Sequence, residues 1–185
     1  EVVVPVPDTS RTAAQSLAEE LALPCREGLI KNRYVGRTFI MPSQAVREKA
    51  VSVKLNTVTP VIKGKEILLV DDSIVRGTTS KKIVKLVKRE AKRVHLLSTC
   101  PPIKSPCVYG IDMPSKEELI ASSRSIEEIR RELGADELTY MSVEELKKAL
   151  DTDGLCTACL TGEYPTGINN EIRLEFSDVR KKERC

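Results

Sequence analysis

One stretch of the sequence, residues 66–98, most constrains how the chain can fold. Residues 66–70 read as a buried strand, 81–91 have the apolar spacing of an amphipathic helix, and 94–98 form a second apolar run. Strand, helix and strand in this order form a βαβ unit, whose two strands run parallel. The unit predicts an α/β fold in which a parallel sheet is flanked by helices.

The N-terminal part of the chain adds further elements to this unit. Residues 2–6 are a nearly unbroken β-branched run, which predicts a strand, and periodic apolar residues over 13–23 predict a helix. Another strand is predicted at 27–31. Residues 32–43 carry Gly, Pro and basic residues without a clear period, which indicates a long loop, and helical spacing resumes over 44–55.

The C-terminal third is predicted to be mostly helical up to Leu150 and irregular beyond it. Three Ser-x-x-Glu capping boxes each predict the start of a short amphipathic helix, and they are Ser115/Glu118, Ser125/Glu128 and Ser142/Glu145. We therefore expect one domain over 1–150 and a cysteine-containing, metal-binding tail over 151–185.

The loop after the first strand of the βαβ unit carries the strongest chemical signal. Asp71 and Asp72 lie at the carboxyl end of the predicted strand, where open parallel sheets bind their ligands. The backbone N–H groups of residues 74–79, with the Ser73, Thr78 and Thr79 hydroxyls, could hold a phosphate monoester at the start of the helix. A triphosphate-binding loop requires a lysine directly after its glycine, and no lysine follows Gly77. The alternative is that Asp72 or Ser73 merely caps the helix.

Overall charge excludes some classes of partner. Lys and Arg total 30 against 27 Asp and Glu, and the net charge of +3 predicts neither nucleic-acid nor membrane binding. No apolar run approaches the roughly 20 residues that span a bilayer, and no export signal opens the sequence, so we expect a cytoplasmic protein. The start at Glu1 rather than Met suggests a fragment of a longer chain.

Basic residues gather in one segment, residues 31–54. They are Lys31, Arg33, Arg37, Arg47, Lys49 and Lys54, against a single acid, Glu48. A lid with this charge could stabilise a pyrophosphate leaving group while it excludes water. A solvated basic face is the alternative for any one of these side chains. His95, the single histidine, falls within a strand pattern and is predicted to be structural.

The six cysteines favour metal or redox chemistry over disulfides. Cys156 and Cys159 form a C-x-x-C pair, and Cys107 lies about fifty residues earlier. A closed tetrahedral site needs four ligands, so these three are one short. All-thiolate zinc is one reading and a redox pair is another. Cys25, Cys100 and Cys185 have no assigned role.

The string VDDSIVRGTT resembles the phosphoribosyl pyrophosphate (PRPP) signature of type I phosphoribosyltransferases. Together with PVPDTS, GLIKNRYVGRTFIMPSQ, VYGIDMPS and EELIAS, it resembles the glutamine PRPP amidotransferase family over nearly the whole chain. The resemblance implies that Asp71 and Asp72 hold the ribose hydroxyls and the Mg²⁺ environment, with Thr9 joining the metal site. It also implies substrate contacts from Ser73, Ile74, Val75, Arg76, Gly77, Thr78 and Thr79.

The same resemblance implies the reaction, transfer of the phosphoribosyl group of PRPP to ammonia in the first step of purine biosynthesis. Arg37 and Lys54 would contact pyrophosphate, and Tyr34 would help to form an ammonia channel. Cys107, Cys156 and Cys159 would be ligands of a 4Fe-4S cluster whose fourth ligand precedes this segment. A glutaminase domain with a catalytic cysteine would precede it too, since nothing in the chain matches one, and a homo-oligomer is expected.

Two other functions stay open at this point. A PRPP-sensing regulator would keep the phosphate loop and add a DNA-binding segment, for which the sequence offers no helix-turn-helix candidate. A base-specific phosphoribosyltransferase would need an aromatic stacking platform, which is hard to build from two Phe and four Tyr.

Overall fold

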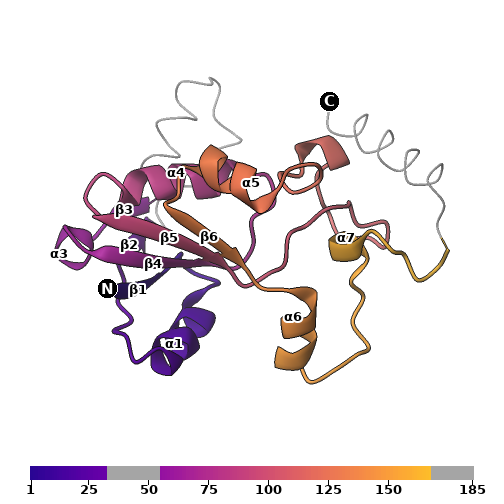
Figure 1. Ribbon diagram of the computed structural model, residues 1–185, viewed down its shortest axis with the longest axis horizontal. Helices are drawn as coiled ribbons and strands as arrows, with labels where there is room; N and C mark the ends of the chain where they lie inside the picture. The colour runs from indigo at the N-terminus through magenta and orange to yellow at the C-terminus, as the bar shows by residue number, and fades with distance from the viewer. Residues whose placement is uncertain (33–54, 168–185) are drawn as a thin grey trace.

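The computed structural model describes residues 1–32 and 55–167 (Figure 1). Its centre is a four-stranded parallel sheet with the strand order β1-β4-β5-β6. The strands are β1 (Val2–Pro5), β4 (Glu66–Asp71), β5 (Arg93–Ser98) and β6 (Glu137–Tyr140). Helix α4 (Thr78–Val87) connects β4 to β5, which pair in parallel. The βαβ unit and the α/β class predicted from the sequence are confirmed.

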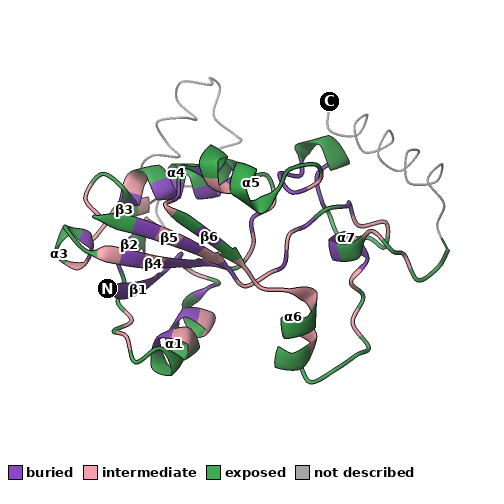
Figure 2. Cartoon of the chain, in the orientation of Figure 1, coloured by how far each residue is buried: buried purple, intermediate pink, exposed green. Residues whose placement is uncertain are grey.

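Helices cover both faces of the sheet, with α1 (Arg11–Glu20) on one face and α4 and α5 (Ile126–Leu133) on the other (Figure 1). Successive side chains of a strand point to opposite faces. Val2 and Val4 of β1 therefore join the main core beneath α4 and α5, whereas Val3 packs against α1. The central strands are buried along most of their length (Figure 2), which explains why they read as continuous apolar runs.

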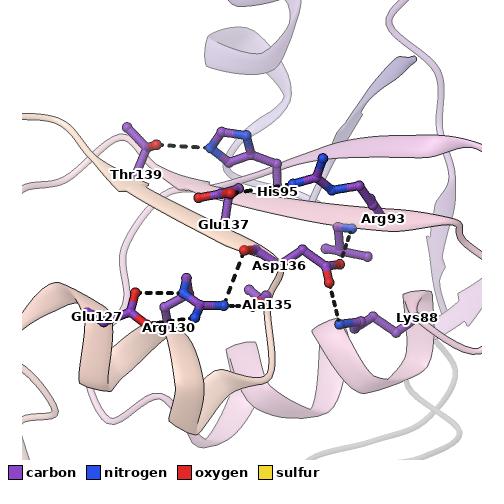
Figure 3. Close-up of polar contacts among 10 residues, drawn as sticks. Lys88, Arg93, His95, Glu127, Arg130, Ala135, Asp136, Glu137 and Thr139 are labelled. Carbon is purple, nitrogen blue, oxygen red and sulfur yellow. Dashed lines mark hydrogen bonds and ion pairs between the residues drawn. The ribbon is translucent and has the colours of Figure 1, made fainter.

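Strand β6 corrects the prediction that the C-terminal third is helical up to Leu150. It pairs in parallel with β5, with Leu138 opposite Leu96. The residues just before it hold it in place (Figure 3): the Asp136 carboxylate accepts hydrogen bonds from Val94 N at 2.8 Å and Lys88 Nζ at 2.9 Å. β6 has four residues, and only one of them, Leu138, is buried. A strand this short shows too little alternation to be recognised in the sequence.

Figure 3 also shows the single histidine. His95 Nε2 lies 3.0 Å from Thr139 Oγ1, so the side chain links β5 to β6 across the sheet. On the same junction, Arg130 of α5 donates to the backbone oxygens of Ala135 and Asp136. These contacts fit the structural role predicted for His95.

A separate antiparallel pair lies beside the main sheet, formed by β2 (Leu29–Lys31) and β3 (Leu55–Thr57). The strand predicted at 27–31 is thus confirmed at its C-terminal end. Leu55 belongs to β3 and not to the helix predicted over 44–55, because its backbone pairs with Lys31. Residues 33–54 lie outside the described part of the chain. Past β3, the short helix α3 (Thr59–Ile62) leads back to β4.

The capping boxes open elements of different length. Those at Ser125 and Ser142 begin α5 and α6 (Val143–Ala149), as predicted, whereas the box at Ser115 begins only the 3-10 helix η2 (Lys116–Glu118). The tail is not wholly irregular, since it contains α7 (Ala158–Thr161). Within the described ranges, no helix has the length and apolar character that crossing a membrane requires.

Candidate functional site

The carboxyl edge of the sheet brings two loops together. β1 and β4 are parallel neighbours, and the ladder extends past β1 through a hydrogen bond of 2.8 Å from Val6 N to Val70 O. The turn over residues 7–10 and the loop over 71–79 therefore leave the same edge of the sheet. Thr9 is exposed in that turn. Thr9 therefore lies at the same sheet edge as Asp71 and Asp72.

The two carboxylates at this edge differ in their surroundings. Asp71 ends β4 and is only 6% exposed, whereas Asp72 is exposed. Asp71 Oδ1 accepts a hydrogen bond from Asp72 N at 3.0 Å, and Oδ2 lies 3.5 Å from the Ser80 hydroxyl of α4. The Asp72 carboxylate accepts one from Ser73 N at 2.8 Å. Their backbone oxygens face Thr99, which follows β5. Asp71 is thus fixed by the sheet, and Asp72 faces outward beside it.

Burial, and after it the charge of the neighbouring Asp72, together raise the pKa of Asp71 to about 7. The ionised carboxylate of Asp71 is therefore unfavourable in these surroundings and would be stabilised by a nearby cation. Carboxylate oxygens are the ligands that Mg²⁺ prefers, and Mg²⁺ often takes one or two of them together with substrate phosphates. The acidic pair fits such an ion by donor chemistry and by charge.

The rest of the loop has some residues buried in the core and others exposed to solvent. Ile74 is buried in the main core, and Gly77 is buried too, while Thr78 and Thr79 are exposed at the start of α4. Gly77 is the residue before the helix, and its φ of 77° lies in the left-handed region that favours glycine. In the described structure no side chain caps α4. The first N–H groups of this helix are therefore available to an anion.

This arrangement decides between two readings of the loop. If Asp72 or Ser73 only capped the helix, one of them would stand just before it, but the helix begins at Thr78 and Gly77 takes that position. Thr9 does not cap α1 either, because the preceding residue there is Ser10. The loop between β4 and α4 is consequently a separate feature of the sheet edge and not an extended helix cap.

Part of the predicted basic lid borders this edge. Lys31, in β2, lies 3.3 Å from the Asp8 carboxylate in the turn that carries Thr9, and Arg11 lies 3.6 Å from the same group. The other predicted lid residues, Arg37 and Lys54 among them, lie outside the described residues, as does Tyr34 of the predicted ammonia channel. Sequence reasoning had not singled out Asp8 or Arg11, whose pairing only the folded turn reveals.

The three cysteines predicted to bind a cluster lie in one region of the fold. Cys107 and Cys159 both pack against a small core formed by Ile103, Met113, Leu119 and Leu160. Burial raises the pKa of the Cys159 thiol, and the nearby Cys107 and Cys156 thiols raise it further. Over residues 1–32 and 55–167, however, no three His, Cys, Asp or Glu side chains are grouped so that they could hold a metal ion. The soft thiol set suits iron-sulfur chemistry, but these residues do not form a closed site.

Protein contacts also hold the tail, which the sequence had not predicted. The backbone N–H groups of Lys104 and Ser105 donate to Cys159 O at 2.9 and 3.0 Å. The Tyr164 hydroxyl donates to Pro106 O, and its ring lies 6.0 Å from that of Tyr109. These aromatic and backbone contacts attach residues 159–164 to residues 104–109.

A cavity of about 590 Å³ lies away from this edge. Its lining includes Glu66 and Arg93, the first residues of β4 and β5, and Leu17 and Leu21 near the end of α1. These residues are at the amino end of the strands, on the α1 face. Ligands of open parallel sheets bind at the opposite end, so the cavity is not the candidate site.

Comparison with known proteins agrees with this geometry. The family model described as "Phosphoribosyl transferase domain" matches residues 1–120. An amidophosphoribosyltransferase of Methanocaldococcus jannaschii is 56% identical over 172 residues, which cover 92% of this chain and 36% of that protein. One of Pyrococcus horikoshii is 59% identical over 166 residues, covering 89% of this chain and 36% of the relative.

Solved structures show the same likeness. The glutamine PRPP amidotransferase of Bacillus subtilis, solved with ADP and GMP, matches with a TM-score of 0.82 and 53% identity, covering 92% of this chain and 39% of that one. The chain thus spans well under half the length of these relatives. Since the family model matches residues 1–120, which are more than half of the chain and include β1 and the loop at 71–79, the chain belongs to the phosphoribosyl transferase domain family.

Proposed function

We propose that this chain is the PRPP-binding synthase part of an amidophosphoribosyltransferase. It would transfer the phosphoribosyl group of PRPP to ammonia, giving 5-phosphoribosylamine and pyrophosphate in the first step of de novo purine biosynthesis. One observation carries the proposal: a buried and an exposed carboxylate, Asp71 and Asp72, stand beside an uncapped helix start at one sheet edge. The names of the similar proteins support it.

In this proposal the loop divides into two parts. Residues 74–79, with the Ser73 hydroxyl, bind the 5-phosphate through N–H and hydroxyl groups at the N-terminus of α4, where the helix dipole favours an anion. Asp71 and Asp72 accept hydrogen bonds from the ribose hydroxyls. With Thr9 they would also hold Mg²⁺, which when bound supplies positive charge near the pyrophosphate. No covalent nucleophile is needed, because ammonia attacks the anomeric carbon as pyrophosphate leaves.

The basic segment completes the site in this proposal. Arg37 and Lys54 would stabilise the charge that develops on pyrophosphate, and Tyr34 would border the path of ammonia. These residues lie outside the described part of the chain, so their roles rest on the resemblance of GLIKNRYVGRTF to the family. The neighbouring Lys31 supports a basic surface at this edge, since it pairs with Asp8 beside Thr9.

We also propose that residues 1–150 are the phosphoribosyltransferase domain and that 151–185 are a metal-binding tail. Cys107, Cys156 and Cys159 would be ligands of a 4Fe-4S cluster, with a fourth from a segment that precedes this one. Their proximity and soft donor chemistry support the assignment, and all-thiolate zinc is the competing metal. No step of the reaction depends on this group.

The partners follow from the reaction. The much greater length of the relatives supports a parent protein in which a glutaminase domain releases ammonia from glutamine. The proposal keeps the cytoplasmic location and the homo-oligomeric assembly expected from the sequence. A base-specific phosphoribosyltransferase and a PRPP-sensing regulator are less favoured. The proteins that are similar to most of this chain are named amidophosphoribosyltransferases.

The test supplies the intact protein with PRPP, Mg²⁺ and ammonium and measures pyrophosphate release. Asp71→Asn and Asp72→Asn should each lower turnover by roughly a hundredfold or more, the range for loss of a charge-positioning group. Asp153→Asn, a change at an exposed carboxylate in the tail, is the matched control and should leave turnover unchanged. Release that requires a nucleobase, or wild-type turnover in both loop variants, would refute the proposal.

A second arm of the test addresses the lid. Arg37→Ala and Lys54→Ala should lower turnover more than they weaken binding of ribose 5-phosphate, because that ligand lacks the pyrophosphate group. Equal losses for turnover and for ribose 5-phosphate binding would place these side chains elsewhere.

A further inference from the structure

The segment over residues 115–121, which includes most of the EELIAS string, packs directly against the phosphate loop although it follows that loop by some forty residues. Arg76 Nε donates to Glu118 Oε1 at 2.9 Å across a sequence separation of 42. Ile120 N donates to Val75 O at 3.0 Å. Two neighbouring residues of the loop are therefore bonded to this one segment.

Glu118 takes part both in the capping box of η2 and in the ion pair with the phosphate loop. Its second oxygen, Oε2, accepts a hydrogen bond from Ser115 N at 3.0 Å, which closes the capping box of η2. One carboxylate thus joins the start of η2 to the guanidinium of Arg76. The side chains of Arg76 and Glu118 are 44% and 45% exposed, so the pair lies at the surface, where an anion can reach it.

Ile120 supports the same loop from within. It is 2% exposed, and a Cβ built on Gly77 would lie 2.4 Å from Ile120 Cδ1. The loop consequently rests against this segment at Gly77, is bonded to it at Val75, and is paired with it at Arg76. A shift of residues 115–121 would move the N–H groups that precede α4.

The other capping boxes provide an internal comparison. Glu145 caps α6 in the same way, accepting from Ser142 N at 2.7 Å, and Glu128 caps α5, accepting from Ser125 N at 2.8 Å. Glu145 lies on α6, which follows β6. Among the described residues, no hydrogen bond joins its carboxylate to the phosphate loop. Glu118 differs from both in that its carboxylate also reaches the phosphate loop.

We propose that Glu118 is a positioning residue for the 5-phosphate, acting through Arg76; this rests on the proposed function of residues 74–79. A guanidinium has five N–H donors in one plane, so the bond from Nε to Glu118 fixes the direction of the others. Arg76 is then held with its charge beside the anion site before a ligand arrives. Pre-organisation of this kind acts on binding more than on the chemical step.

Substitutions at Glu118 separate the cap from the ion pair. Gln is accepted at this position of a capping box, so Glu118→Gln keeps the bond to Ser115 N but presents an uncharged amide to Arg76. Glu118→Ala removes both contacts. Glu145→Ala is the matched control, because it removes an equivalent cap from α6.

The experiment measures the Kd for ribose 5-phosphate and for ribose, the KM and kcat for PRPP, and the Tm of the intact protein. Glu118→Ala and Glu118→Gln should both weaken ribose 5-phosphate binding and raise KM by up to about fivefold, the limit expected of an exposed ion pair. Their kcat and their affinity for ribose should not change. Glu118→Gln should restore the Tm that Glu118→Ala loses, and Glu145→Ala should lower Tm without changing the Kd. In an Arg76→Ala background, Glu118→Ala should have no further effect on the Kd.

Two outcomes would overturn the proposal and are distinguishable from each other. If the wild-type protein fails to bind ribose 5-phosphate, both the proposed function and the role of Glu118 are wrong. If the wild-type protein binds it and Glu118→Gln binds it equally well, Glu118 is only a helix cap and the function of the loop is unaffected.

Discussion

The phosphate loop and the cysteine tail are built in contrasting ways. The loop over residues 71–79 is continuous with β4 and α4, and Asp71, Ile74 and Gly77 are buried. The tail is attached by the small core around Leu160, by backbone bonds to Cys159 and by two tyrosines. The loop is therefore part of the central fold, whereas the described part of the tail, residues 151–167, is attached at the periphery by these contacts.

The two regions nevertheless meet. Val75 of the loop packs against the same small core as Cys107 and Cys159. The contrast shows that a substrate site in this fold is made from the central sheet, and that a site added at the periphery needs stabilisation of its own. Changes in the loop should alter global stability, while changes in the tail should act locally.

The largest effect on stability is expected at Asp71. Because its pKa is raised from 3.8 to about 7, the folded protein binds this proton more tightly than the unfolded chain does. The stability that this proton contributes is present at low pH and is lost as the pH rises from about 4 to about 7. Asp71→Asn should therefore raise the free energy of unfolding at pH 8, without Mg²⁺, by on the order of 4 kcal/mol, and by little at pH 4.

Denaturant unfolding of the intact protein at the two pH values measures this difference. Asp153→Asn serves as the control, since it makes the same change at an exposed carboxylate of the tail. An Asp71→Asn variant that is no more stable than wild type at pH 8 would show that burial of Asp71 imposes no such penalty.

Gly77→Ala should have the next largest effect. The added methyl group would press on the buried Ile120 side chain, and the φ of 77° is unfavourable for alanine. We expect a loss of about 3 kcal/mol in the free energy of unfolding, together with weaker ribose 5-phosphate binding. Gly134→Ala has a similar φ of 75°, but no described atom lies within 4 Å of its Cβ, so it should lose only about 1 kcal/mol.

The difference between the two glycine variants isolates the contact with Ile120. Equal losses would mean that backbone conformation alone matters at both positions. Adding Ile120→Val to Gly77→Ala should recover part of the loss, because the shorter side chain lacks the Cδ1 atom that the new methyl group meets.

The smallest effect is expected in the tail. Leu160 is 7% exposed in the small core, and Leu160→Ala should remove about 2 kcal/mol from the local stability of residues 151–167. Amide hydrogen exchange should speed up at Lys104 and Ser105, whose N–H groups donate to Cys159 O, with little change in β4 or β5. Equal acceleration in the central strands would show that the tail and the sheet unfold as one unit.

Sequence patterns predicted much of the fold because the central elements are local and strongly patterned. The apolar runs of β4 and β5 and the amphipathic α4 between them were predicted as a βαβ unit, which the structure confirms. The capping boxes at Ser125 and Ser142 located α5 and α6 because a cap is a contact between residues three apart. The position of the acidic pair at the carboxyl edge follows from the same unit.

Tertiary structure decided what depends on contacts between distant segments. Strand β6 exists because Asp136 and Leu138 meet β5, and its four residues carry too little pattern to be recognised alone. The burial that raises the pKa of Asp71, the pairing of Glu118 with Arg76 and the attachment of Tyr164 to Pro106 join residues that no local period relates. The sequence by itself determined the type of sheet and the chemistry at its edge. Packing decided how that chemistry is tuned, because burial and long-range pairing arise only when the elements come together.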